Sequence, residues 1–287
     1  MDYVKPGDVL VNMVEAGSAK GGLPMRQLLL RGVMSGALLG VATSLAVGAT
    51  VQSGQPIVGA LIFPVGFVMI LLLGMELVTG SFALLPVAAA SGRASAAQVL
   101  RNWTWVFVGN LLGSLAYAAL LAVVLTNGGT GAANPVGAAI IKIAEAKTIG
   151  NAAIGLPGML TVFVKAMLCN WMVCLGVVMS MVSTNVIGKI AAMWLPILIF
   201  FAQGFEHSVV NMFVIPAGML MGAHVSMADW WIWNQIPVTL GNVVGGALFT
   251  GFAMYYAYRK PVPAPARDSA QALPGSASDL PLRVEAQ

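Results

Sequence analysis

Residues 204–216 read GFEHSVVNMFVIP, and they lie in an apolar stretch of 34 residues, Ile190 to Ala223, whose only titratable side chains are Glu206 and His207. A helix needs about 20 apolar residues to cross a bilayer, so the stretch is too long for one crossing. It is too short for two, because each piece beside the polar centre spans too little at about 1.5 Å per residue. We therefore expect one crossing built from two half-helices, with a break at Glu206 and His207.

A second stretch of the same kind lies earlier in the chain. Gln55 to Ser91 has 37 residues with Glu76 as its only charge, and it contains GMELVTGSFALLP at 74–86. The two segments share G-x-E and a proline ten residues after the glutamate, at an offset of 130 residues. The pattern N-x6-G-N-x2-G also recurs, at 102–113 and 234–245. The chain is therefore predicted to be an internal duplication.

The composition indicates an all-α integral membrane protein. Hydrophobic residues make up 59% of the 287 residues and charged residues only 8%, against roughly 25% charged residues in soluble domains. The opening residues lack the basic-then-apolar pattern of a signal peptide, so we expect the first span to act as its own signal. Besides the two long stretches, four ordinary spans are predicted: Leu28 to Thr50, Trp103 to Thr126, Pro157 to Val182 and Asn234 to Tyr258.

The placement of basic residues supports six crossings with both termini in the cytoplasm. In that arrangement eleven of the fourteen lysines and arginines lie on the cytoplasmic side, as the positive-inside rule requires. Counting each interrupted stretch as two crossings would place Arg93, Arg101 and Lys189 outside. Six crossings are therefore the better prediction.

Two halves with three crossings each must lie upside down relative to each other. We expect inverted repeats at about 28–126 and 157–258, with the second and fifth helices broken and a permeation site where the breaks meet. Residues 1–260 would form one transmembrane channel domain, and 261–287, rich in Pro, Ala and Ser, a disordered cytoplasmic tail. The spacing of Cys169 and Cys174 suits neither a zinc site nor a disulfide framework. No metal, cofactor or nucleic-acid partner is expected.

The carboxylates of Glu76 and Glu206 are expected to accept hydrogen bonds from backbone amides bared by the breaks, as a helix cap does. Direct contact with a substrate is the alternative for both. His207 occurs in one half only, since its counterpart is Leu77. A residue that serves one central site needs to occur once, and a histidine can change charge near neutral pH or donate a hydrogen bond to an anion.

The alternative for His207 is a buried neutral histidine held by the backbone or by Asn170. Thr79, just after the first break, is expected to bind the same ligand or His207, or else to serve only as a hydroxyl at a helix start. The backbone amides at the half-helix starts favour an anionic ligand over a cationic one.

Four blocks of the sequence resemble the formate/nitrite transporter family of bacterial anion channels. They are FPVGFVMILLLGMELVTGS (63–81), CNWMVCLGVVMS (169–180), PILIFFAQGFEHSVVNMFVIPAG (196–218) and IPVTLGNVVGG (236–246). The resemblance implies an aquaporin-like protomer in a homopentamer of the bacterial cytoplasmic membrane. It also implies a pore in each protomer for small monovalent anions such as formate, nitrite or hydrosulfide.

The resemblance also implies roles for single residues. His207 matches the central pore histidine, which interacts with or protonates the anion. The other matches are Thr79 in the loop that breaks the second span, Asn170 near the histidine, Lys147 in the outer vestibule, Phe63 and Phe200 at the outer constriction, and Phe67, Leu77, Val78 and Val173 at the inner one. The chain departs from the family at Val78, Phe67 and Ser81, where phenylalanine, leucine and asparagine occur in other members.

The expected function is a channel or transporter, not an enzyme, for weak-acid anions (formate or nitrite), with proton linkage through His207 and Glu206 beside the pathway. A hydrosulfide channel is an alternative. A neutral-solute channel of the aquaporin type should carry Asn-Pro-Ala at its breaks, which neither GMELVTG nor GFEHSVV does. A haem-bearing membrane anchor should have two facing histidines, but the second histidine, His224, lies at the end of a span.

Overall fold

The computed structural model describes residues 2–259, and within that range the chain is helical apart from turns, loops and one isolated bridge between Tyr3 and Ser183. The predicted tail at 261–287 lies outside the described residues. The helices, including two π-helical segments η1 and η2, are α1 (Pro6–Gly22), α2 (Met25–Ser53), α3 (Pro56–Ile62), α4 (Pro64–Leu72), α5 (Val78–Ala90), α6 (Ala96–Leu125), α7 (Pro135–Lys147), α8 (Ile149–Ala152), α9 (Leu156–Ser180), α10 (Val186–Ala202), α11 (Ser208–Leu220), α12 (Met227–Trp230), η1 (Trp231–Gln235), α13 (Ile236–Val244), η2 (Gly245–Phe252) and α14 (Ala253–Tyr258).

Four helices in residues 2–259 are long and apolar enough to cross a membrane. They are Met25–Ser53, Ala96–Leu125, Leu156–Ser180 and the continuous run Met227–Tyr258. Each contains most or all of one predicted ordinary span and extends beyond it at one end or both. Polar residues at helix ends cause the difference: α6, for example, begins seven residues before Trp103, where Ser95 and Gln98 form a capping box.

The two long apolar stretches are each interrupted in the middle. Residues 73–77 separate α3 and α4 from α5, and residues 203–207 separate α10 from α11. The second residue of each interruption is a glycine in the left-handed region, Gly74 at φ 64° and Gly204 at φ 63°. A side chain is disfavoured in that conformation, so these glycines let the chain turn out of one helix and into the next.

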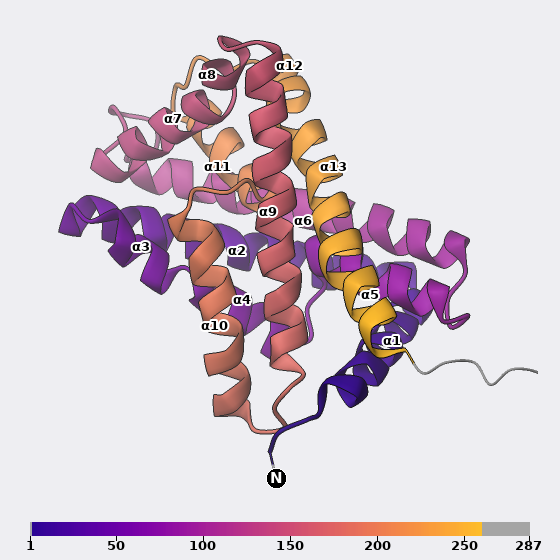
Figure 1. The fold of residues 1–287 in the computed structure, drawn as a ribbon. Helices are drawn as coiled ribbons and strands as arrows, with labels where there is room; N and C mark the ends of the chain where they lie inside the picture. The colour runs from indigo at the N-terminus through magenta and orange to yellow at the C-terminus, as the bar shows by residue number, and fades with distance from the viewer. Residues whose placement is uncertain (1, 260–287) are drawn as a thin grey trace, which may run out of the picture.

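The long helices pack in two corresponding pairs, in which α2 runs along α6 while α9 lies between α10 and α13 (Figure 1). Glycines bring the backbones of each pair together. A Cβ atom at Gly36 of α2 would collide with the carbonyl oxygen of Asn110 in α6, and one at Gly245 would collide with that of Met167 in α9. Small residues at helix contacts of this kind are typical of membrane proteins.

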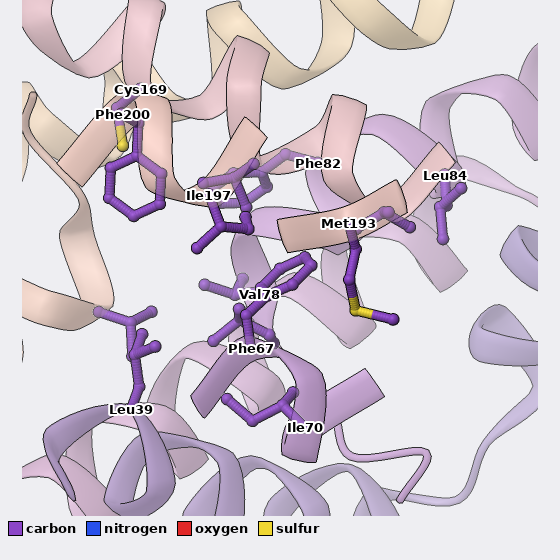
Figure 2. Packing of buried hydrophobic residues seen from close by; sticks show 14 of the residues in the cluster. Leu39, Phe67, Ile70, Val78, Phe82, Leu84, Cys169, Met193, Ile197 and Phe200 are labelled. Atoms are coloured by element: carbon purple, nitrogen blue, oxygen red, sulfur yellow. The ribbon is translucent and has the colours of Figure 1, made fainter. Parts of the chain in front are cut away.

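The outer face of the bundle is also apolar. Leu120, Val123 and Val124 of α6 are 59–68% exposed, and Leu156 at the start of α9 is 80% exposed. Inside, a buried cluster joins α2, α4, α5, α9 and α10, and Figure 2 shows Phe67, Val78 and Ile197 among its members. A molecule that is apolar both inside and outside suits a lipid environment.

The N-terminal helix α1 packs against α5 and α6. Its buried positions are Val9, Leu10, Met13, Gly17 and Gly21. Gly17 lies so close to Leu84 of α5 that an added Cβ would collide with the Leu84 carbonyl oxygen. The helix is therefore an integral part of the described structure.

Candidate functional site

Thr79 and His207 meet where the half-helices α5 and α11 begin. Thr79 Oγ1 lies 3.1 Å from His207 Nε2, and both side chains are buried. His207 also caps α11, because its Nδ1 accepts the backbone N–H of Val210 at 3.2 Å. A neutral imidazole that accepts at Nδ1 carries its proton on Nε2. The ring therefore presents an N–H donor toward Thr79. Of the alternatives left open for Thr79, the hydrogen bond to His207 is the one that the structure has.

The first break is held by Asn110 of α6. Its Oδ1 accepts the N–H of Val78 at 3.0 Å, and its Nδ2 donates to the carbonyl oxygens of Glu76 and Gly32, each at 2.9 Å. Ser35 also donates to the Glu76 carbonyl. The Asn110 carboxamide thus pairs both the amide and the carbonyl that the break removes from the helical ladder.

Asn242 of α13 holds the second break in the same way. Its Oδ1 accepts the N–H of Ser208 at 2.8 Å, while its Nδ2 donates to Glu206 O at 2.9 Å and to Ala166 O at 2.8 Å. We call Asn110 and Asn242, which lie at the same position of the repeated N-x6-G-N-x2-G pattern, the asparagine clamps. Each fastens one non-helical segment to two long helices.

The prediction that Glu76 and Glu206 cap the bared amides is wrong. Lys20 Nζ lies 2.8 Å from Glu76 Oε1, and Lys147 Nζ lies 2.8 Å from Glu206 Oε2. A carboxylate only accepts hydrogen bonds, whereas an asparagine amide also donates, so it can satisfy an N–H and a C=O together. The carboxylates instead form ion pairs, in which Glu76 and Glu206 are 3% and 5% exposed.

Lys147 and His207 line one cavity of about 190 Å³, together with Thr43, Phe200 and Val210 among others. We call it the Lys147 cavity. It joins the ion pair of the second break to the imidazole. Lys147, which pairs with Glu206, and His207 thus line the same cavity.

A second cavity of about 420 Å³ lies beside the first break. It is lined by Lys20, Arg31, Lys189 and Glu76, among others, and we call it the Lys20 cavity. A smaller space of about 20 Å³, room for roughly one water, adjoins it, because the two share Lys20 and four further residues. The small space is also lined by Phe67, Leu77 and Gly80.

The aromatic residues assigned to the outer constriction lie together. The Phe63 ring meets that of Phe200 edge to face at 5.5 Å, and the Phe200 ring stacks on the His207 ring at 5.6 Å. Phe200 therefore covers one face of the imidazole.

The residues assigned to the inner constriction do not all line the same space. All four are buried in the main apolar cluster: Phe67, Leu77, Val78 and Val173. Phe67 and Leu77 line the small space beside the Lys20 cavity. Val78 instead lines a groove with Phe82, Trp103 and residues of α6 and α13.

Asn170 supports Thr79 rather than His207. Its Nδ2 donates to Thr79 O at 3.1 Å and to Asn242 O at 2.6 Å. The alternative in which Asn170 satisfies His207 is thus replaced by an indirect connection, in which Asn170 positions the backbone of Thr79.

Sequence reasoning missed the asparagine clamps and the partner of Glu76. The repeated G-N pair is the signal that could have identified Asn110 and Asn242, because a polar amide within an apolar span is costly unless it is paired. Lys20 gave no such signal, since it lies 56 residues from Glu76 in a helix outside the predicted spans.

Comparison with known proteins identifies the family. Residues 7–256 match the family model described as formate/nitrite transporter. The chain belongs to the formate/nitrite transporter family. Membership of this transporter family, together with the long apolar helices, makes it a membrane protein.

Individual members of the formate/nitrite transporter family are similar along nearly their whole length. The chain is 34% identical over 273 residues to a probable formate transporter of Methanothermobacter thermautotrophicus, covering 90% of this chain and 98% of that protein. It is 28% identical over 288 residues to the formate channel FocA of Escherichia coli K12, covering 90% and 95%.

Two solved structures of similar proteins have the same fold. One is an FNT family ion channel, 26% identical with a TM-score of 0.74, covering 88% of this chain and 98% of that one. The other is a pentameric formate channel with formate bound, 28% identical with a TM-score of 0.68, covering 82% and 97%.

Proposed function

We propose that this protein is a channel for small monovalent weak-acid anions, with formate as its first substrate. The observation that carries the proposal is the Thr79–His207 contact at the starts of two half-helices. His207 lines the Lys147 cavity, and Gly80, the residue after Thr79, lines the small space that adjoins the Lys20 cavity. Helix N-termini and an imidazole N–H donor favour an anion over a cation. Formate is named for several relatives and for a structural neighbour.

The proposed path runs from the Lys147 cavity past Phe63, Phe200, His207 and Thr79 to the inner constriction and the Lys20 cavity. Lys147 and Glu206 form the entrance, and Asn170 keeps Thr79 in position. The inner constriction is formed by Phe67 and Leu77, which line the small space beside the Lys20 cavity, with Val78 and Val173 packed in the same apolar cluster. A bare anion between these apolar groups is costly, and a hydrogen bond from His207 Nε2 lowers that cost at the centre.

Proton linkage is part of the proposal, and the geometry limits how it works. The anion shares the Nε2 proton of His207 through a hydrogen bond. A doubly protonated ring would need Nδ1 to give up the N–H of Val210, because a protonated nitrogen cannot accept. The proton that neutralises a weak-acid anion therefore comes from solution together with the anion. The hydrogen bond from His207 Nε2 assists the transfer of that proton to the anion.

The overall organisation is proposed on the same basis. Residues 1–260 form one transmembrane channel domain with six crossings, and the halves at about 28–126 and 157–258 are inverted repeats in an aquaporin-like protomer. The paired asparagine clamps and the paired Lys–Glu contacts support this reading. We further propose a homopentamer in the bacterial cytoplasmic membrane, with both termini in the cytoplasm.

Uptake into proteoliposomes tests the function. Formate, nitrite and hydrosulfide are offered in parallel, with and without an inward proton gradient, to vesicles with and without the protein. Formate uptake that is fastest of the three and stimulated by the gradient is expected. Equal, gradient-insensitive uptake of all three would remove both the preference for formate and the proton linkage. No uptake above empty vesicles would overturn the channel.

A further inference from the structure

Three buried side-chain oxygens beside the first break have no hydrogen-bond partner within residues 2–259. They are Glu76 Oε2, Ser81 Oγ and Asn102 Oδ1. The side chains are almost completely buried, with residue exposures of 2%, 0% and 0%. Because a buried polar atom without a partner costs free energy, these oxygens point to a missing donor.

The second break shows which donor that is. There, Asn211 Nδ2 donates one hydrogen to Glu206 Oε2 at 2.7 Å and the other to Asn234 Oδ1 at 2.8 Å. Glu206, Asn211 and Asn234 correspond to Glu76, Ser81 and Asn102 at offsets of 130, 130 and 132 residues. Asn211 thus pairs the oxygen of Asn234, whose counterpart Asn102 Oδ1 is unpaired at the first break, and it also pairs the carboxylate of Glu206. At the second break Lys147 and Asn211 share one oxygen, Glu206 Oε2, whereas at the first break Lys20 takes Glu76 Oε1 and Oε2 is left unpaired in the described part of the chain.

The surrounding contacts show that the two sets of residues are arranged alike. Asn102 Nδ2 donates to Lys20 O, and Asn234 Nδ2 donates to Lys147 O, each at 3.1 Å. In both cases the side chain of the same lysine reaches the glutamate at 2.8 Å. The bridging residue differs, because a serine hydroxyl has one hydrogen where the carboxamide has two. Asn234 Nδ2 also lies 3.4 Å from Glu206 Oε2.

We propose that one ordered water molecule binds between Glu76, Ser81 and Asn102 and takes the place of the Asn211 carboxamide. Its two hydrogens go to Glu76 Oε2 and Asn102 Oδ1, and its oxygen accepts the Ser81 hydroxyl hydrogen. Three partners are the usual number for a buried water. Lys20 already supplies a positive charge at Glu76 Oε1, which favours a neutral ligand over a metal cation.

A density map of the purified protein that resolves ordered waters tests the site directly. The expected result is a peak at hydrogen-bond distance, about 2.7–3.0 Å, from all three oxygens. In Ser81→Asn the peak is replaced by the side-chain amide, and in the matched variant Asn211→Ser a new peak forms at the second break. A wild-type map without the peak overturns the proposal. So does a peak at about 2.3–2.6 Å from oxygen ligands, a distance typical of a bound cation such as Ca²⁺.

Thermal unfolding provides a second measurement. Ser81→Ala removes one of the three partners of the water and lowers the apparent Tm, by about 2–4 °C for one hydrogen bond. Ser81→Asn supplies both donors covalently, so its Tm equals or exceeds that of the wild type. A Tm for Ser81→Asn below that of Ser81→Ala contradicts the correspondence between the breaks. If neither variant can be purified, the wild-type map alone decides.

Discussion

Thr79 Oγ1 lies 3.1 Å from His207 Nε2, although the two residues are 128 positions apart in the chain. The contact joins the segment after the first break to the segment after the second. One ring nitrogen of His207 serves the fold by capping α11, and the other faces Thr79. The same side chain therefore has a structural part and a part available for a ligand, and substitutions can separate the two.

Replacing His207 with asparagine should separate capping from anion transfer. Asparagine is a favoured N-cap residue, so its Oδ1 can accept the Val210 N–H while the imidazole is lost. We expect His207→Asn to keep the wild-type Tm within a few degrees but to lose proton-stimulated formate uptake, measured in proteoliposomes.

The companion variant His207→Phe loses both the cap on α11 and the Nε2 hydrogen-bond donor. It is expected to lose uptake together with the cap, which costs about 0.5–2 kcal/mol of stability. Wild-type, proton-stimulated uptake in His207→Asn would show that the ring is needed only for the fold.

Substitutions of Lys147 and Glu206 should have strongly non-additive effects on the free energy of unfolding. Lys147→Met leaves a nearly buried carboxylate without its cation, and breaking a buried pair costs about 3–5 kcal/mol. The double variant Lys147→Met, Glu206→Gln removes both charges and should recover most of that loss in unfolding free energy. Asn211 donates to Glu206 Oε2, and it can donate to the glutamine oxygen in the same way. Additive effects in the double-mutant cycle would mean that the pair does not form.

The asparagine clamps should matter most for stability. Asn242→Ala leaves the Ser208 amide and the carbonyls of Glu206 and Ala166 without this partner, at about 1–3 kcal/mol for each group left unpaired. We expect a lower yield of folded protein and a markedly lower Tm. Asn110→Ala is expected to do the same at the first break. A Tm within one or two degrees of the wild type for either variant would contradict the assigned role.

Gly17 tests the attachment of α1. Gly17→Ala places a methyl group against the backbone of Leu84 and the side chain of Ala88, so α1 must move away from α5. We expect faster proteolysis near the N-terminus, measured by limited digestion and mass spectrometry. Gly22→Ala, at the end of the same helix with nothing within 4 Å of the added atom, is the matched control. Equal digestion of both variants would show that the close contact has no effect.

Several features of the fold could be predicted from the sequence because they follow from length and repetition. The apolar stretches around Glu76 and Glu206 are too long for one crossing and too short for two, and the structure has a non-helical segment in each. The contact between Thr79 and His207 was one of the alternatives that the sequence left open, because Thr79 follows the first break and His207 lies in the second.

The partners of the breaks could not be predicted in the same way. The carboxylates looked like caps because the sequence shows which polar group is near in the chain, not which one is near in space. Asn110 and Asn242 reach the breaks from helices that follow about 30 residues later. Which side chain pairs with a bared backbone group depends on how helices distant in sequence pack together. The same packing decides that Val78 lines a groove with Phe82 and Trp103, whereas Phe67 lines the small space beside the Lys20 cavity.

The asparagine clamps also constrain how the protein can move. Shifting α5 or α11 as a rigid gate would require several buried hydrogen bonds to break at the same moment, whereas rotating an apolar side chain breaks none. Side-chain rotations occur in picoseconds to nanoseconds when the residue is not tightly packed, and collective helix movements take microseconds or longer. In the proposed channel the breaks therefore act as a fixed aperture, and control of flow falls to the rotation of single side chains along the path.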